Sequence, residues 1–284
     1  MATIEYMPAR LTPEESEDLR RAVACLEGAS FAQRLTDAIG RPVGMLSRTL
    51  PQPARRVIAH VSETALRSAL KLALRTLDLN ASATKPANRA HKLALAASGA
   101  VGGALGLAAL PVELPISTTI LLRSIAEIAR EEGEDLTAPE AAFACVEVFA
   151  LGGAGNGESA FESGYFAVRA ALAKSVTDSA RFVAAQGAAA LPAPVVARLI
   201  SQIAARFGVV VSEKLAAQAA PVLGAIGGAA VNAAFADHFQ TLARGHFIVR
   251  RLERRHGASV VAFEYQRLQG ERGCGYTESR RAAS

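Results

Sequence analysis

The stretch LALAASGAVGGALGLAALPVELPISTTILL, residues 93–122, contains four glycines and a single charged residue, Glu113. A second run rich in alanine and glycine occupies residues 215–236. Both runs repeat small residues at intervals of four: Gly99 and Gly103, Gly102 and Gly106, and in the second run Ala220, Gly224, Gly228, Asn232 and Ala236. Because this spacing lets two helix backbones approach closely, we expect the runs to form two helices that pack together at the centre of the fold.

The composition of the 284-residue chain favours helix over sheet. Apolar residues make up 51% of the chain and aromatic residues only 5%, with no tryptophan. Alanine has the highest helix propensity, and the two-residue turns that mark β-hairpins are absent. We predict an all-α fold with a single helical domain over residues 30–265. A helical extension over residues 1–29 would precede it, and a disordered basic tail over residues 266–284 would follow.

The two runs also raise the question of membrane insertion. A spanning helix needs about 20 apolar residues, and the uncharged stretches 93–110 and 215–236 are just long enough. Each stretch holds few large apolar side chains, which lowers the free energy gained on insertion. Three arrangements stay open: a buried hairpin in a soluble or peripheral protein, a re-entrant or membrane-inserting hairpin, and a multi-pass topology.

The net charge of +5 is unevenly distributed along the chain. It is +5 over residues 1–92, −4 over residues 93–236 and +4 over residues 237–284. Basic ends suit contact with an anionic surface such as lipid headgroups, although arginine-rich helices also present solvated faces without any partner. We expect no nucleic-acid partner, since neither a known binding motif nor interleaved aromatic residues accompany the arginines.

The cysteines and the N-terminus bear on the compartment. Cys25, Cys145 and Cys274 lie far apart and show no CxxC spacing, so we expect neither a disulfide framework nor a zinc site. This cysteine usage favours a reducing compartment. The acidic N-terminus lacks the apolar segment of a secretory signal. We therefore expect a cytoplasmic location, with peripheral or integral attachment to the inner face of the cell membrane left open.

Capping residues predict several helix boundaries. Thr12 and Glu15 have the spacing of a capping box, in which each side chain bonds the backbone N–H of the other residue. Ser30 is expected to open a short second helix. Thr137 and Glu140 predict another capping box before the helix AAFACVEVFALGG, residues 141–153.

Glu113 is the sharpest polar feature of the first run. It lies between Pro111 and Pro115, where a carboxylate is either exposed at a hairpin tip or buried and paired. A buried carboxylate needs a cation or several donors, and Arg123 and Arg130 follow on the same segment. The simplest alternative is a carboxylate beside the positive end of a helix that begins near Pro115.

Glu147 is isolated in an otherwise apolar helix. We expect it to form a structural ion pair, with Arg123 or Arg244 as the natural partner, rather than to act as an acid or base.

Several polar residues gather in the segment that begins at Asn232. Asp237 and His238 are adjacent, and His246 follows His238 by eight residues, which is about 12 Å along a helix. That distance is too long for one metal centre, so we predict no metal site. Asp237 and Arg244 are expected to bond neighbouring helices.

Common catalytic and nucleotide-binding patterns are missing from the sequence. GxSxG is absent, and the glycines near residue 102 do not form GxGxxG within a βαβ unit. The phosphate-binding loop with its Lys-Ser/Thr pair is absent too. We therefore expect no nucleotide and no other cofactor.

Four strings resemble the EcsC family of bacterial proteins. They are FAQRLTDAIGRPV (31–43), LPVELPISTTILLRSIAEIAREEGEDL (110–136), CVEVFALGG (145–153) and VSEKLAAQAAPVLGAIGGAAVNAAFADHFQTLARGHFIVRRLERRHG (211–257). The resemblance implies an all-helical fold and a link to membrane processes, because the namesake is encoded beside an ABC transporter. It implies no particular reaction. The shared polar positions correspond to Glu113, Arg123, Glu127, Glu147, Asn232, Asp237, His238 and Arg244.

Two functions follow as hypotheses. The first is a membrane-associated accessory protein that contacts lipid or a membrane protein such as an ABC transporter. The second is a hydrolase or lipid-modifying enzyme that uses Glu113, Glu147, Asp237 and His238 around one pocket. The remaining polar residues would form a binding or structural cluster: Arg123, Glu127, Asn232, Arg244 and His246. Convergence of the four candidate catalytic groups on one cavity would favour the enzyme. The oligomeric state is left open.

Overall fold

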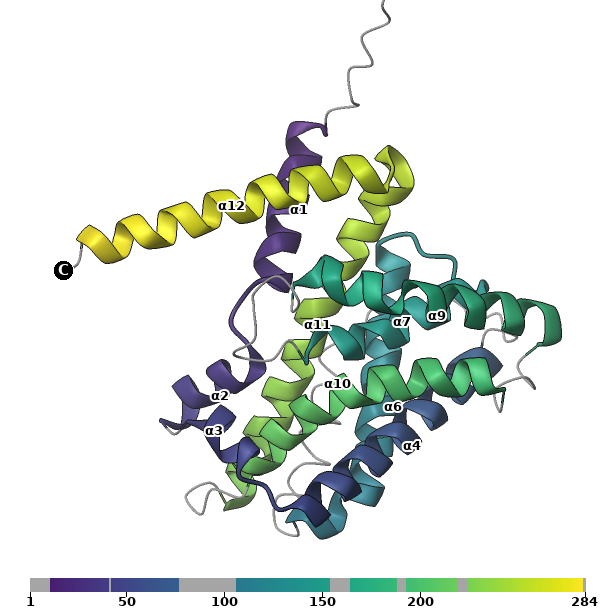
Figure 1. Cartoon of the computed structure of the whole chain (residues 1–284), viewed down its shortest axis with the longest axis vertical. Helices are drawn as coiled ribbons and strands as arrows, with labels where there is room; N and C mark the ends of the chain where they lie inside the picture. Colours follow the sequence, from purple (N-terminus) through teal and green to yellow (C-terminus); the bar gives the residue numbers. More distant parts are fainter. Residues whose placement is uncertain are drawn as a thin grey trace, which may run out of the picture.

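The computed structural model describes residues 11–40, 42–76, 106–153, 164–187, 193–218 and 224–282. Within these ranges it is all-α, as predicted, with ten α-helices, one 3-10 turn and no strand (Figure 1). The elements are α1 (Pro13–Leu26), α2 (Phe31–Ile39), α3 (Val43–Arg48), α4 (Gln52–Thr76), η1 (Gly106–Ala109), α6 (Leu110–Glu131), α7 (Pro139–Leu151), α9 (Tyr165–Gln186), α10 (Pro194–Gln218), α11 (Gly224–His256) and α12 (Ala258–Ala282).

The predicted caps of the first two helices are present. The Thr12 hydroxyl accepts the Glu15 N–H at 3.2 Å, and the Glu15 carboxylate accepts the Thr12 N–H at 3.0 Å. The Ser30 hydroxyl caps α2 by accepting the Gln33 N–H at 3.2 Å. Gly40 ends α2 with a φ of 71°, a left-handed conformation that glycine adopts at low cost.

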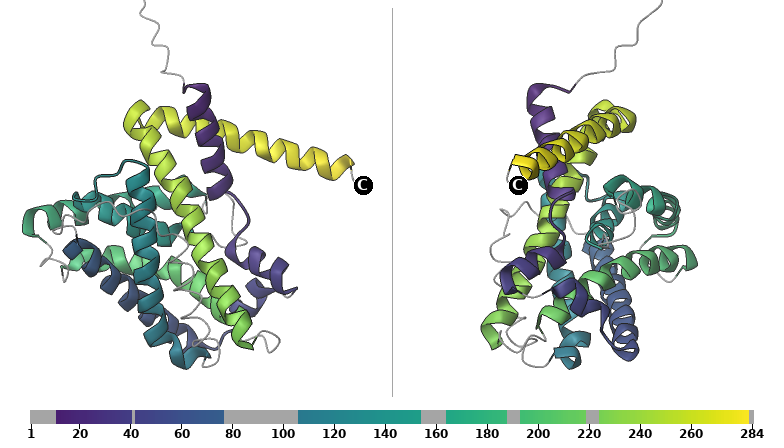
Figure 2. Two further views of the ribbon diagram at one scale, coloured as in Figure 1. Left: turned by 180° about the vertical axis from the view of Figure 1, so that it is seen from behind. Right: turned by 60° about the vertical axis from the view of Figure 1, so that its left-hand side comes forward.

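Helix α11 organises the fold. Its 33 residues span about 50 Å, and α1, α6, α7 and α10 all pack against it (Figures 1 and 2). An aromatic cluster marks the place where α7, α10 and α11 meet. Phe149 lies 5.1 Å from Phe207 and 5.2 Å from Phe239 between ring centroids. Such contacts among large apolar side chains supply much of the burial that stabilises a helical core.

Helix α10 is the single candidate membrane span among the described residues. It is 25 residues long, and the mean hydropathy of its most apolar 18-residue segment is 1.5. Of that segment, 44% is buried inside the molecule. The helix crosses the middle of the molecule and packs against α4, α7 and α9 (Figure 1). A core helix of this kind passes the same test of length and composition as a spanning helix.

The second alanine- and glycine-rich run is described only in part, as the end of α10 at Gln218 and the start of α11 at Gly224. Residues 219–223 lie outside the described residues, so the expected single helix over residues 215–236 stays a prediction. Residues 93–105 of the first run lie outside the described residues, as does Ala220, so the predicted packing of the two runs stays a prediction.

Two other helix boundaries differ from expectation. α6 begins at Leu110 rather than near Pro115, with Pro111 in its first turn and Pro115 inside the helix. The capping box at Thr137 and Glu140 is not formed. The Asp135 carboxylate instead accepts both the backbone N–H (2.9 Å) and the hydroxyl (2.6 Å) of Thr137. Ala138 is therefore the N-cap of α7.

The C-terminal segment is helical where a disordered tail was expected. α12 continues to Ala282 and extends away from the other helices (Figures 1 and 2). Pairing along the helix supports it, because Arg267 bonds Glu264 at 2.8 Å one turn earlier and Glu271 one turn later.

Candidate functional site

Buried polar groups lie at three levels along α11. Asn232, His238 and His246 are all buried, and their spacing along the helix is about 9 Å and about 12 Å. Each of the three meets side chains from a different set of helices. We call these places the Asn232 level, the His238 level and the His246 level.

The Asn232 level is a buried ion pair completed by an amide. The Lys214 ammonium, which is fully buried, donates to Oε1 of Glu113 at 2.7 Å. Asn232 donates to the same oxygen at 3.1 Å, and the Phe235 ring centroid lies 4.8 Å from the Lys214 Nζ. Burial lowers the pKa of Lys214 below its ordinary value, against the opposing attraction of the Glu113 carboxylate.

Glu113 is therefore buried and paired, with 6% of its side chain exposed, but its partners are not those predicted. Arg123 and Arg130 are both exposed on α6. They lie on other faces of the helix that carries Glu113, so they point away from it. Lys214 was not predicted as the partner of Glu113, although its position in the sequence indicates burial. It follows the buried residues Phe207 and Val211 by seven and three positions, which places it on the buried face of α10.

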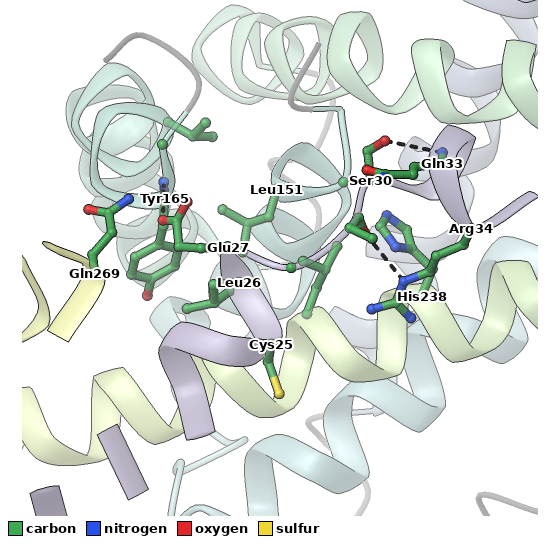
Figure 3. Close-up of a pocket in the computed structure, with 16 residues that line it drawn as sticks. Cys25, Leu26, Glu27, Ser30, Gln33, Arg34, Leu151, Tyr165, His238 and Gln269 are labelled. Carbon is green, nitrogen blue, oxygen red and sulfur yellow. Dashed lines mark hydrogen bonds between the residues drawn. The ribbon is translucent and has the colours of Figure 1, made fainter. Parts of the chain in front are cut away.

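The His238 level opens into a cavity of about 280 Å³. The turn between α1 and α2 forms one wall, and the end of α7, the start of α9 and part of α11 form the others (Figure 3). Its polar lining comprises Cys25, Glu27, Ser30, Gln33, Arg34, Tyr165, His238 and Gln269. Of these, only His238 was a predicted site residue.

The charged groups of this cavity are held by the surrounding helices. Arg34 donates from Nε to the Ala29 carbonyl at 3.3 Å. Oε1 of Glu27 accepts the Tyr265 hydroxyl at 2.9 Å and the Tyr165 N–H at 3.4 Å. The second of these bonds places the carboxylate at the start of α9, where the helix dipole favours a negative charge.

His238 is neutral in this environment. Only 4% of it is exposed, and burial, followed by the nearby Arg34 charge, lowers its pKa to about 4 against the backbone of Gly152 and the Asp237 charge. Its ring centroid lies 5.3 Å from those of both Phe31 and Phe239. Nε2 of His238 is buried without a hydrogen-bond partner in the described part of the chain.

The His246 level is a network of bidentate ion pairs around a hydrogen-bonded ring. Nδ1 of His246 lies 3.0 Å from the Tyr165 hydroxyl. Arg169 on α9 bonds both carboxylate oxygens of Glu253 at 2.8 and 3.0 Å. Arg250 bonds both oxygens of Glu134 at 2.8 and 3.1 Å. Burial lowers the pKa of His246 well below its ordinary value, and the two arginine charges add to this effect.

Glu147 approaches the His246 level without joining an ion pair. It is 5% exposed, and burial raises its pKa to about 7 while the charges of Arg169 and Arg250 oppose the rise. No hydrogen bond or ion pair links Glu147 to another described residue. The predicted partners Arg123 and Arg244 are both exposed, so the expectation of an ion pair with either one is wrong.

The four candidate catalytic groups do not converge on one cavity. Glu113 belongs to the Asn232 level, His238 to the cavity, and Glu147 to the surroundings of Arg169 and Arg250. Asp237 is half-buried beside His238 but is not among the residues that line the cavity. Glu127 is half-buried on α6. Among the described residues, no three His, Cys, Asp or Glu side chains are grouped so that they could hold a metal ion.

The arginines near the end of α11 are neutralised by carboxylates of the same chain. Arg251 lies 2.5 Å from Asp18 and 3.2 Å from Glu132, and Arg254 pairs with Glu134. His256 lies 3.0 Å from Glu15. This end of the molecule therefore presents fewer unpaired positive charges than its sequence suggests.

Comparison with known proteins identifies a family. The sequence model described as the EcsC protein family matches residues 15–252, which is most of the chain. No curated protein and no solved structure matches the chain. The match includes Asn232, His238 and His246, and on this evidence the chain belongs to the EcsC protein family.

Proposed function

We propose that the protein is a membrane-associated accessory protein that docks reversibly on an anionic bilayer. The docking surface lies at the end of the molecule where α4 and α6 begin (Figures 1 and 2). The observation that carries the proposal is a pair of exposed apolar side chains in the first turns of α6. Val112 is 68% exposed and Ile116 is 49% exposed, and their spacing of four places them on one face of the helix.

The neighbouring helices add further apolar groups. Met45 and Leu46 are exposed on α3, and Val57 is exposed near the start of α4. α4 packs closely against α6. Single exposed apolar residues are ordinary on protein surfaces, but a group of them at one end is typical of an interaction site.

The charge at this end suits an anionic surface. Arg48, Arg55 and Arg56 are exposed at the end of α3 and the start of α4. Arg55 donates to the Leu50 carbonyl at 3.0 Å and also bonds the Arg48 carbonyl, which holds the two arginines near each other. The first turns of α3 and α4 contain no acidic residue. We call this surface the α3–α4–α6 end.

The expected affinity is modest. Each basic side chain near an anionic leaflet contributes about 1 kcal/mol, and this contribution decreases with salt. A few half-buried aliphatic side chains add to it. Reversible docking of this kind requires neither a spanning helix nor a covalent lipid anchor.

Vesicle sedimentation tests the proposal. We expect the purified full chain to bind vesicles of phosphatidylglycerol and phosphatidylcholine, and to be released by high salt and by omission of the anionic lipid. Replacing two charges in the Arg48→Gln, Arg56→Gln variant should weaken binding about 30-fold. The Val112→Asp, Ile116→Asp variant should weaken it comparably.

Matched controls separate this surface from general charge or hydrophobicity. Phe263→Asp removes an apolar side chain that is as exposed as Val112, on α12, and Arg181→Gln removes an exposed charge on α9. Neither control should change binding. Equal binding of all variants, or binding to native membranes but not to protein-free vesicles, would overturn lipid docking. The second outcome would point to a membrane protein, such as the ABC transporter that the EcsC resemblance implies.

The alternative of a hydrolase centred on Glu113, Glu147, Asp237 and His238 receives no support from the geometry, because these residues belong to separate levels of the structure. We therefore do not advance it.

A further inference from the structure

The cavity at the His238 level has opposite charges at its two ends. Figure 3 shows Arg34 and His238 at one end, with Glu27, Tyr165 and Gln269 at the other. Leu26 and Leu151 lie between them. The cavity is therefore polar at both ends and aliphatic in the middle.

Each end keeps bonding capacity that the described residues do not use. Among the described residues, the Arg34 guanidinium makes one hydrogen bond, from Nε to the Ala29 carbonyl. Nε2 of His238 is buried beside Gly152 and forms no hydrogen bond of normal geometry with a described residue, although buried polar atoms in folded proteins are almost always hydrogen-bonded. At the other end, the bonds from Tyr265 and Tyr165 both go to Oε1 of Glu27, and no described residue bonds Oε2.

The opposite charges at the two ends restrict the charges that a ligand of this cavity can carry. A simple anion beside Arg34 would also face the Glu27 carboxylate across the cavity, and a simple cation beside Glu27 would face Arg34. Bringing a charge into a partly enclosed site is costly unless an opposite charge meets it. A molecule that carries both charges satisfies both ends at once.

We propose that this cavity binds a small zwitterion of the size of an amino acid, with its carboxylate held by Arg34 and His238 and its ammonium group held by Glu27. The volume of about 280 Å³ lies just below the range for drug-sized ligands, which suits a small molecule. The neutral His238 ring donates to the carboxylate from Nε2, and the Glu27 carboxylate accepts from the ammonium group. Leu26 and Leu151 contact the carbon skeleton. This site is independent of the docking surface proposed above.

The first test uses the wild-type full chain and needs no variant. Thermal unfolding is measured with each proteinogenic amino acid at about 10 mM, which would nearly saturate a site with a Kd of about 1 mM. At least one amino acid should raise the melting temperature. Its N-acetyl derivative, which lacks the ammonium group, and its methyl ester, which lacks the carboxylate, should each bind at least tenfold more weakly in calorimetry.

Two variants, each of which removes one charge, assign the two ends of the cavity. Glu27→Gln keeps an oxygen for the two tyrosine bonds but loses the negative charge, and Arg34→Gln loses the positive charge. Each should weaken binding of the free amino acid at least tenfold. Glu27→Gln should also remove the preference over the N-acetyl derivative, and Arg34→Gln the preference over the ester. The Glu63→Gln variant changes a half-exposed carboxylate on α4 that does not line the cavity, and it should bind as the wild type does.

The proposal fails if no amino acid shifts the melting temperature of the wild-type chain. It also fails if the ester and the N-acetyl derivative bind as tightly as the free amino acid, because the two charges would then play no part. Unchanged binding in both folded variants would place the ligand outside this cavity.

Discussion

The Nζ of Lys214 on α10 lies 2.7 Å from Oε1 of Glu113 on α6, although the two residues are 101 positions apart in the sequence. This pair joins two helices at a place where both side chains are almost completely buried. Lys214 donates no other hydrogen bond within the described residues. Its positive charge is therefore stabilised by Glu113 and by the face of the Phe235 ring.

Breaking this pair on one side should destabilise the fold strongly. Lys214→Met leaves the Glu113 carboxylate buried with only the Asn232 amide, and uncompensated buried charges typically cost about 3–5 kcal/mol. The double variant Glu113→Leu, Lys214→Met removes both charges and should be more stable than the single variant. Urea denaturation measures both, and a double variant less stable than Lys214→Met would contradict this account.

Gly245 allows α1 to pack closely against α11. A Cβ atom at this position would lie 2.7 Å from Cγ of Leu26 and 3.0 Å from Cβ of Cys25. Gly245→Ala should therefore cost about 1–3 kcal/mol, because these side chains must move. The control is Gly270→Ala on the exposed part of α12, where a Cβ atom meets nothing within 4 Å. That change should stabilise the helix by up to about 1 kcal/mol, and equal melting temperatures for the two variants would refute the steric explanation.

Glu147 should make stability depend on pH in a defined direction. Burial raises its pKa from an ordinary 4.5 to about 7. Between these values the folded protein keeps a proton that the unfolded chain has lost, so stability falls as pH rises through this window and the loss is complete above pH 7. Glu147→Gln cannot ionise. Between pH 5 and pH 8, its free energy of unfolding should therefore rise by up to roughly 3 kcal/mol relative to that of the wild type.

Denaturant unfolding at the two pH values measures this difference, and the titration of His238 and His246 cancels because both proteins contain them. Glu131→Gln, which replaces an exposed carboxylate on α6, provides the control and should show no such gain. A difference between Glu147→Gln and wild type that stays constant from pH 5 to pH 8 would exclude titration of Glu147 in this range.

Glu134 should contribute more to stability than an exposed carboxylate of the same type. It is nearly buried, bonds Arg250 through both oxygens and also pairs with Arg254. Glu134→Gln should cost about 1.5–3 kcal/mol, the range for hydrogen bonds to charged groups. Glu63→Gln breaks the pair with Arg67, which is much less buried than Glu134, and should change stability by less than about 0.5 kcal/mol. Similar losses in calorimetry for the two variants would mean that burial adds nothing to the Glu134 pairs.

Most helices could be predicted from the sequence, because composition and capping residues act over only a few positions along the chain. The capping box at Thr12 depends only on Glu15, three positions away, and the helix class depends on composition. The box predicted at Thr137 failed because Asp135, two residues earlier, bonds the same backbone N–H and hydroxyl. Short-range patterns of this kind compete, and geometry decides between them.

The candidate site depended on contacts that local patterns do not encode. The sequence left open whether Glu113 is exposed at a turn or buried and paired, and the identity of Lys214 as its partner required the packing of α6 and α10 against α11. No sequence pattern marked Arg34 or Glu27 as site residues. Their place in a cavity becomes visible only when the turn between α1 and α2 faces His238 on α11.

The three polar levels of α11 share one uninterrupted helix, and this has a consequence for the kinds of sequence change the protein can accept. Inserting or deleting one residue between Asn232 and His238 would rotate everything beyond it by about 100° and shift it by about 1.5 Å. His246, Arg250 and Glu253 would then all leave their partners together. In a mutational scan, length changes in this helix should be far more damaging than any single replacement, whereas the exposed part of α12 should accept them.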